Sequence, residues 1–168
     1  MNSLESLEKS LDDLFVKKAP PLPPGGKKAL VEYLPWINLV LGLLELWTVS
    51  ILWHWAHVAN SIGTLYGSLT IANRGMNAGL WLGLVLLGVQ AIIYIAAFSP
   101  TKARKKSGWD LLFYALLLNI VYGAVIMFTS YGGVGNLISS IIGSGVGFYL
   151  LFQIRSSYSK ESASKKSA

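Results

Sequence analysis

The chain has 168 residues, of which 53% are hydrophobic and 13% charged, and its mean hydropathy is +0.51 with a formal net charge of +6. A soluble domain carries about 25% charged residues, so the composition excludes an ordinary water-soluble domain and indicates a protein that needs lipid. There is no cysteine, which excludes disulfides, thiolate metal sites and thiol nucleophiles.

The first 32 residues are predicted to form a unit outside the membrane. In residues 1–18, leucines recur at the spacing of an amphipathic helix or of two heptads, at Leu4, Leu7, Leu11 and Leu14. Two heptads are too short to be stable alone in water, so this helix is expected to lie on the membrane surface, on the bundle or on a second copy, or to bind a partner. Residues 19–32, which include "APPLPPGG", predict a semi-rigid linker.

Four later stretches reach the length of roughly 20 apolar residues that a helix needs to cross the hydrocarbon core. They are residues 34–59, 78–98, 109–130 and 134–154. Because lipid offers the backbone no hydrogen-bond partners, such stretches must be helices. The predicted fold is therefore all-α. It is a four-helix transmembrane bundle over residues 33–155, and residues 156–168 form a disordered tail.

The basic residues set the expected orientation. All but Arg74 of the 14 basic residues lie before the first span, between the second and third, or after the fourth. Since cytoplasmic loops carry the excess of Lys and Arg, we expect both termini and the N-terminal amphipathic helix to be cytoplasmic (N-in, C-in) in a multi-pass protein of the cell membrane. The positive charge then faces anionic lipid, and no recognition motif accompanies it that would favour a nucleic-acid partner.

The loop at residues 60–77 is the longest between spans. Its apolar residues Ile62, Leu65, Leu69 and Ala72 recur at helical spacing, which predicts a short interfacial or re-entrant segment. An ordinary extracytoplasmic loop is the alternative that remains open. By contrast, the connection between the last two spans is so short that they must be antiparallel neighbours.

Helices in lipid associate through small residues and interhelical hydrogen bonds. The sequence offers two predicted packing stripes, one made of Gly75, Gly79 and Gly83 and the other of Ser139, Gly143 and Gly147. Either stripe suits packing within the chain or contact with a second copy in a homodimer, and the sequence does not decide between these.

One polar residue lies near the middle of each span. These residues are Glu45, Gln90, Asn119 and Ser144. A carboxylate at the bilayer centre costs at least 2.5–3.5 kcal/mol, so we expect Glu45 to be uncharged and hydrogen-bonded to Gln90 or Asn119. Asn38, two turns earlier, extends the polar stripe. Two interpretations remain: Glu45 fixes helix register, including assembly with a partner, or it carries protons or binds cations in a transporter or channel.

Two histidines and six aromatic residues mark the ends of the spans. His54 and His57 share a helix face, as metal ligands would, but zinc requires three or four protein ligands. We therefore interpret them as interfacial residues and expect no metal or cofactor. Trp36 and Trp109 are predicted at the cytoplasmic membrane boundary, and Trp53, Trp55, Trp81 and Tyr131 at the opposite one, whereas Trp47 lies near mid-span.

The stretches "GLLELWTVSIL" (residues 42–52) and "IIGSGVG" (residues 141–147) resemble the first and fourth helices of small multidrug transporters. That family also has four helices, a mid-membrane glutamate in the first and a glycine-bearing fourth helix that dimerises. The chain departs from it in its N-terminal unit, long first loop and basic second loop. "KARKKSGWDLLFYALLLN" and "GSGVGFYLLFQIRSSY" resemble uncharacterised small multi-spanning bacterial membrane proteins, which implies a bacterial cytoplasmic membrane and no particular activity.

Signatures of enzymes are absent from the sequence, which has no Walker-type or dinucleotide glycine loop, no HExxH and no GxSxG. We therefore expect a protein that is not an enzyme. The sequence favours a structural or partner-binding membrane protein, with a small proton- or cation-linked transporter or channel that uses Glu45 as the alternative.

Overall fold

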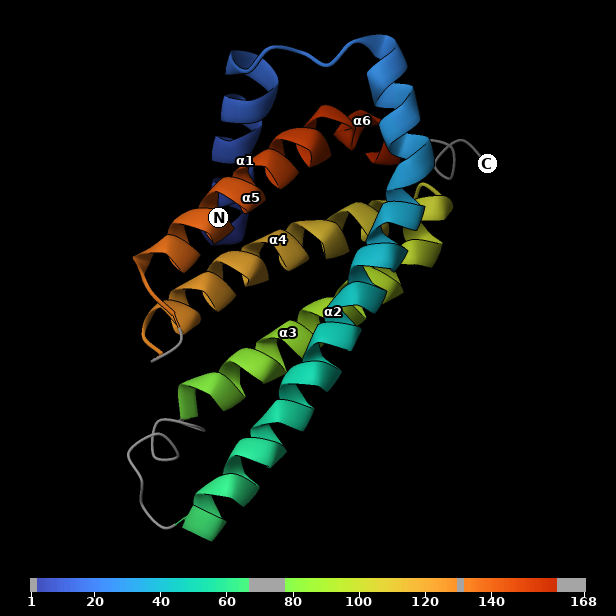
Figure 1. The fold of residues 1–168 in the computed structure, drawn as a ribbon. Helices are drawn as coiled ribbons and strands as arrows, with labels where there is room; N and C mark the ends of the chain where they lie inside the picture. The colour runs from blue at the N-terminus through green and yellow to red at the C-terminus, as the bar shows by residue number, and fades with distance from the viewer. Residues whose placement is uncertain (1–2, 67–77, 130–131, 160–168) are drawn as a thin grey trace.

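The computed structural model describes residues 3–66, 78–129 and 132–159. Four long helices pack side by side in chain order, with α2 along α3, α3 along α4 and α4 along α5 (Figure 1). In order, the elements are α1 (Ser3–Asp12), the π-helix η1 (Asp13–Lys18), α2 (Pro24–Tyr66), α3 (Ala78–Lys102), α4 (Lys106–Met127), α5 (Val134–Gln153) and α6 (Arg155–Ser159). The described residues contain no strand, as the sequence predicted.

The long helices are the predicted spans. Within the described residues, four segments are long and apolar enough to cross a membrane: Pro24–Val58, Trp81–Lys102, Lys106–Met127 and Val134–Gln153. Each satisfies its own backbone hydrogen bonds, as lipid requires. The prediction of an all-helical chain with four such segments is confirmed, and the chain has the architecture of a multi-pass membrane protein.

Helix α2 is longer than predicted at both ends. It begins at Pro24, within the segment expected to be a linker, because proline at a first helical position lacks only a hydrogen bond that would be unmade anyway. The backbone N-H of Lys27 donates to the carbonyl of Pro23 at 3.0 Å and closes the first turn. At the other end the helix continues to Tyr66, so the expected loop begins as helix. Leu69 and Ala72 of that loop lie outside the described residues.

The N-terminal unit folds back onto α5, and its apolar contacts differ from the predicted leucine stripe. Leu11 and Phe15 pack against the core, whereas Leu7 and Leu14 are exposed. The exposure of Leu14 follows from η1, whose wider i→i+5 turn shifts the register after Asp12. One such bond ends it, from the N-H of Ala19 to the carbonyl of Leu14 at 3.1 Å.

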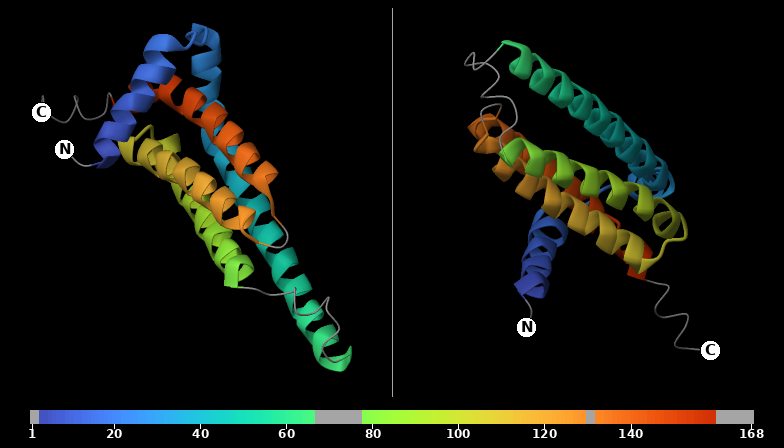
Figure 2. Two further views of the ribbon diagram at one scale, coloured as in Figure 1. Left: turned by 90° about the vertical axis from the view of Figure 1, so that its left-hand side faces the viewer. Right: turned by 90° about the horizontal axis from the view of Figure 1, so that it is seen from below.

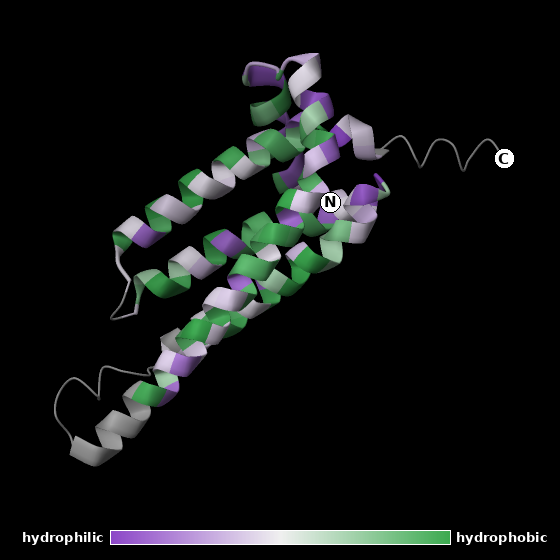
Figure 3. Ribbon diagram, turned by 45° about the vertical axis from the view of Figure 1, so that its right-hand side comes forward, coloured by the Kyte–Doolittle hydropathy of each residue, from purple (hydrophilic) through white to green (hydrophobic). Residues whose placement is uncertain are grey.

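We call one end of the bundle the basic end, defined by Lys27, Lys28, Lys102, Arg104 and Arg155. The start of α2, the α3–α4 turn and α6 lie there, and hydrophilic residues gather at this end in Figure 3. The left-hand view in Figure 2 shows α2 reaching beyond the other helices at the opposite end. The charges and the long apolar stretches are therefore separated along the bundle.

An aromatic core fills the basic end. Trp109 is 1% exposed, stacks on Phe113 with ring centroids 5.5 Å apart, and its indole N-H donates to the carbonyl of Leu151 at 2.9 Å. The sequence placed Trp109 in the belt at the membrane boundary, and the structure corrects this. Phe113 and Phe152 surround its ring, so Trp109 joins α4 to α5 instead of facing lipid.

The turn between α3 and α4 is tight. Arg104 has a positive φ of 54°, and Gly108 lies so close to α3 that an added Cβ would be 2.6 Å from the backbone nitrogen of Thr101. Only glycine permits this approach. The turn fixes the antiparallel pairing of α3 and α4 on which the mid-helix contacts depend.

Candidate functional site

The central pair joins α2 to α3. The side-chain amide of Gln90 donates from Nε2 to Oε1 of Glu45 at 3.1 Å. Gln90 is 2% exposed and Glu45 is partly buried. The sequence predicted that Glu45 would bond Gln90 or Asn119, and this geometry selects Gln90.

Gly42 makes this hydrogen bond possible. It lies one turn before Glu45, and a Cβ added there would be 2.8 Å from Cγ1 of Ile95 and 2.9 Å from the carbonyl oxygen of Ala91. Ala91 is itself fully buried, and the backbone of α2 at Gly42 lies directly against α3 at this small residue. Small residues allow such close approach in membrane helices.

The pair leaves polar atoms without partners. Oε2 of Glu45 and Oε1 of Gln90 are both buried and accept no hydrogen bond. A carboxyl group with one satisfied oxygen and one free oxygen can hold a proton, accept another donor or contact a cation.

A second polar pair joins α4 to α5. Asn119 donates from Nδ2 to the hydroxyl of Ser144 at 3.1 Å, and that hydroxyl donates to the carbonyl of Leu116 at 3.0 Å. Ser144 is completely buried. Among the described residues no hydrogen bond links this pair to Glu45 and Gln90. The four predicted residues thus form two separate interhelical contacts.

The predicted packing stripes are used only in part. An added Cβ at Gly83 would be 2.7 Å from Cδ1 of Ile126, and one at Gly147 would be 2.5 Å from Cδ2 of Leu116, so both face α4. Gly143 has nothing within 4 Å and Ser139 is exposed. Of the described residues of the two stripes, Gly83 and Gly147 are therefore the ones shown to approach α4 closely. Gly79 is partly exposed and Gly75 lies outside the described residues.

A set of contacts at the basic end, which the sequence did not reveal, holds the N-terminal unit. We call it the N-terminal clamp, made of Tyr149, Gln153 and Arg155 of α5 and α6. Gln153, 5% exposed, donates from Nε2 to the carbonyl of Phe15 at 2.7 Å and accepts from the N-H of Leu22 at 3.2 Å. The hydroxyl of Tyr149 donates to the carbonyl of Pro20 at 2.8 Å.

Arg155 completes the clamp with charge. Its Nη1 lies 3.0 Å from Oδ1 of Asp12, and its Nη2 pairs with the carboxylate of Glu8. The guanidinium also lies over the ring of Trp109, 5.2 Å from its centroid. The only sequence signal for this contact was Arg155 itself, a charged residue at the end of the last span. Its partners Asp12 and Glu8 lie more than 140 residues away in the chain.

The two histidines are exposed on α2. The ring of His57 lies 4.9 Å from that of Trp53, which in turn meets Trp81 at 5.1 Å. Nδ1 of His57 is 2.9 Å from the carbonyl oxygen of Trp53. In the part of the chain that the structure describes, no group of three or more potential metal ligands is present. The arrangement is an aromatic contact between α2 and α3.

No protein-family model, curated protein or solved structure matches this chain. Inference about its function therefore rests on the geometry described above. The class that this geometry defines is a multi-pass helical membrane protein with polar interhelical contacts and an N-terminal unit clamped to its basic end.

Proposed function

We propose that this chain is a non-catalytic, multi-pass component of the cell membrane that binds a transmembrane helix of a partner along α2. The observation that carries the proposal is the exposure of α2. Only 11% of the residues in its most apolar stretch are buried against the rest of the chain, compared with 39% of those in the corresponding stretch of α3. At 1.5 Å per residue its 43 residues are about 64 Å long, roughly twice the hydrocarbon core.

The second half of α2 carries two highly exposed tryptophans. Trp47 is 66% exposed and Trp55 is 65% exposed, and Trp47 lies near mid-span, away from either membrane boundary. Tryptophan prefers the boundary, where its ring nitrogen finds a partner. A mid-span tryptophan next to a partly satisfied Glu45 suits a surface that another helix covers.

The basic end faces the cytoplasm in this proposal. The cations of the N-terminal unit, the α3–α4 turn and α6 are at one end of the bundle, as the positive-inside rule expects of N-in, C-in topology. The N-terminal unit then lies as an amphipathic element at the cytoplasmic surface. The resemblances noted above suggest a bacterial cytoplasmic membrane.

Site-directed photo-crosslinking in native membranes tests partner binding. A photoreactive residue at Trp47 or Trp55 is expected to give a discrete protein adduct, either a second copy or another membrane protein. The matched control is Val85, an exposed position at a similar depth on α3. Lipid adducts alone from both α2 positions, or the same protein adducts from Val85, would exclude the proposal.

A second function is favoured by one observation, the buried Oε2 of Glu45 that lacks a partner. A free oxygen on a mid-membrane carboxyl group suits proton or cation transport, because intramembrane ionisable residues commonly serve such pathways. Proton and monovalent-cation flux should be measured in proteoliposomes with wild type and Glu45→Gln. Flux that disappears in a folded Glu45→Gln protein would establish transport, and no flux in either would leave the partner-binding function.

A further inference from the structure

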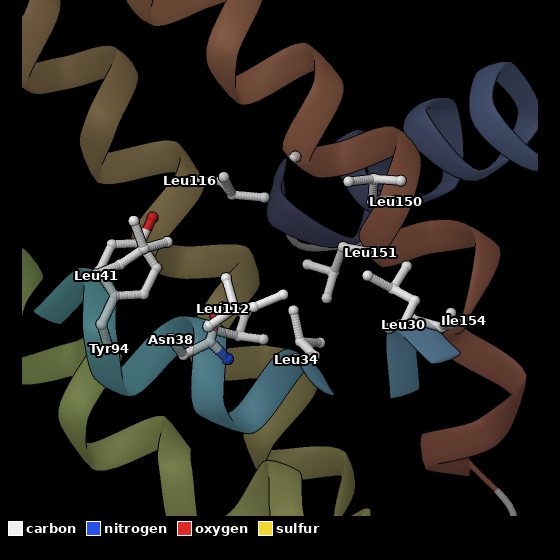
Figure 4. Close-up of a pocket in the computed structure, with 12 residues that line it drawn as sticks. Leu30, Leu34, Asn38, Leu41, Tyr94, Leu112, Leu116, Leu150, Leu151 and Ile154 are labelled. Carbon is white, nitrogen blue, oxygen red and sulfur yellow. The ribbon is translucent and has the colours of Figure 1, made fainter. Parts of the chain in front are cut away.

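A cavity lies inside the bundle near the basic end. Its volume is about 160 Å³, and α2, α3, α4 and α5 all contribute to its wall (Figure 4). Leu34, Tyr94, Leu112 and Leu151 represent the four helices in turn. The helices α2 and α5 are the outer helices of the row and do not pack along each other. The cavity lies in the space between them.

The wall and the volume restrict what the cavity can hold. All but two of its twelve lining residues are aliphatic or glycine, the exceptions being Asn38 and Tyr94. Pockets for drug-sized ligands are about 300–1,000 Å³, so a complete ligand of that size does not fit. The cavity is partly open, and therefore a segment of a hydrocarbon chain can occupy it while the remainder lies in the bilayer.

Asn38 adds one polar feature. It is 2% exposed, it lines the cavity, and its Nδ2 has no hydrogen-bond partner. In Figure 4 its nitrogen points toward the space between Leu34 and Leu112. A buried amide donor without an acceptor carries its full desolvation cost. The ligand that suits this wall is a hydrocarbon chain with a hydrogen-bond acceptor oxygen near the end of the chain that faces the basic end of the bundle.

A second cavity of about 330 Å³ lies at the basic end and is lined by Pro24, Lys27, Lys28, Val31, Arg104 and Ser157. Its lining has three cations and no acid. Among the described residues none of these three cations is within ion-pair distance of a carboxylate. Basic pockets between membrane helices attract phosphate headgroups.

Both cavities have lining residues on α2. Lys27, Leu30, Leu34 and Asn38 follow one another at spacings of three and four residues, so they share one helix face. Lys27 and Asn38 are eleven residues apart in the helix, which corresponds to about 16 Å. A lysine side chain is long and flexible enough to cover part of this distance, and the headgroup layer is about 5–8 Å thick on each side. Phosphate and ester groups of one lipid can therefore meet both residues.

We propose that these cavities form a binding site for one anionic phospholipid. Its phosphate lies among Lys27, Lys28 and Arg104, an ester carbonyl accepts from Asn38, and the upper part of one acyl chain fills the cavity between α2 and α5. The site is separate from the exposed Trp47 and Trp55, because the residues of α2 that it uses lie toward the start of that helix.

Native mass spectrometry of the full chain tests the site. The protein is incorporated into vesicles of phosphatidylglycerol and phosphatidylcholine in equal amounts, extracted in mild detergent, and its retained lipids are weighed. One retained phosphatidylglycerol per chain is expected. Equal retention of both lipids, or of neither, overturns the proposal.

Charge is tested with the triple variant Lys27→Gln, Lys28→Gln and Arg104→Gln. Each cation near a membrane surface contributes about 1 kcal/mol, about fivefold in affinity, so preference for phosphatidylglycerol is expected to fall by about tenfold or more. The matched control replaces Lys18, Lys105 and Lys106 by Gln. These cations are exposed and line neither cavity. An equal loss of preference in the control would show only general surface attraction and would overturn the site.

Asn38→Leu tests the amide separately. It keeps the helix and removes an unpaired donor, so the variant should fold at least as well as wild type. Retention of phosphatidylglycerol is expected to weaken by about two- to tenfold, the value of one net hydrogen bond. Leu34→Trp fills the cavity and should expel the acyl chain more completely. Unchanged lipid retention in both folded variants contradicts placement of the chain in this cavity.

Discussion

Gln90 on α3 donates its side-chain amide to Glu45 on α2 at 3.1 Å, one turn from the point where Gly42 lets the two helices touch. Polar groups in lipid gain from pairing with each other because the bilayer offers no alternative. Here one hydrogen bond and one close approach reinforce each other. The relationship accounts for a glutamate within the apolar run "GLLELW" in structural terms and leaves its second oxygen free for a further role.

Replacement of Gln90 should weaken the α2–α3 contact. Interhelical hydrogen bonds in membrane proteins average about 0.6 kcal/mol and reach about 1.7 kcal/mol, so Gln90→Leu should lower the free energy of unfolding by that amount. Glu45→Gln should be nearly neutral, because an amide oxygen still accepts from Gln90. Unfolding by a detergent titration measures both. The exposed Asn136→Leu is the control, and a Gln90→Leu protein as stable as wild type would contradict the assignment.

Gly42→Ala should separate the two helices. Its Cβ would be 2.9 Å from the carbonyl oxygen of Ala91, which belongs to a helix backbone and cannot move away alone. Overpacking of this kind typically costs about 1–3 kcal/mol. The same unfolding titration measures the loss, and a cysteine pair on α2 and α3 reports their distance.

Gly143→Ala is the matched control for Gly42→Ala. It is also a helical glycine, but nothing lies within 4 Å of its Cβ position. Alanine favours a helix over glycine by roughly 0.5–1 kcal/mol, so this variant should be unchanged or slightly more stable. Equal destabilisation by both substitutions would show that glycine matters here for backbone reasons and not for close approach.

The spans could be predicted because the length of an apolar run can be read directly from the sequence. The long runs ending near Lys102 and beginning near Lys106 needed no tertiary information. Helix ends were less predictable, since Pro24 and Gly25 favour both a linker and a first helical turn. Sequence spacing also failed at Trp109, whose place in a boundary belt or a core depends on where α5 and α6 lie.

The polar residues could be predicted individually but not as pairs. Depth within each span suggested one group of four, whereas the row of helices separates Glu45 and Gln90 from Asn119 and Ser144. Gly42 was hidden because it belongs to no repeated small-residue stripe. The clamp was hidden for another reason: Arg155 meets Glu8 from the opposite end of the chain, and no local pattern records such a contact.

Arg155→Gln should release the N-terminal unit. The side chain pairs with two carboxylates and is 36% exposed, so solvent screening reduces the contribution to about 1 kcal/mol. We expect faster proteolysis within α1 and η1 while the spans stay intact. Lys9→Gln, which removes an exposed cation of α1 that belongs to neither of these ion pairs, is the control. Equal proteolysis of wild type and Arg155→Gln would contradict the clamp.

The π-helix η1 should be most ordered near neutral pH because of Asp13 and Lys17, whose charged atoms are 2.5 Å apart. Hydrogen bonding and charge from Lys17 lower the pKa of Asp13 below 3.8, and the same contact raises the pKa of Lys17 above 10.5. Because the pKa of Asp13 is lowered in the folded form, its stabilising contribution is complete above the unfolded-state pKa and is lost as the pH falls through the folded-state pKa. Because the pKa of Lys17 is raised, its contribution is complete below the unfolded-state pKa and is lost as the pH rises through the folded-state pKa.

Amide chemical shifts of residues 13–18 in nanodiscs, followed across pH, measure this order. The helical shifts should persist between the two limits and decline at both. Because Arg155 pairs with two other carboxylates of this unit, the decisive readout is the difference between wild type and Asp13→Asn, which should lose the part of the acid transition that Asp13 contributes. Glu5→Gln, an exposed acid on α1, should reproduce the wild-type curve. An acid transition of the same size and midpoint in Asp13→Asn would show that the pair with Lys17 does not order η1.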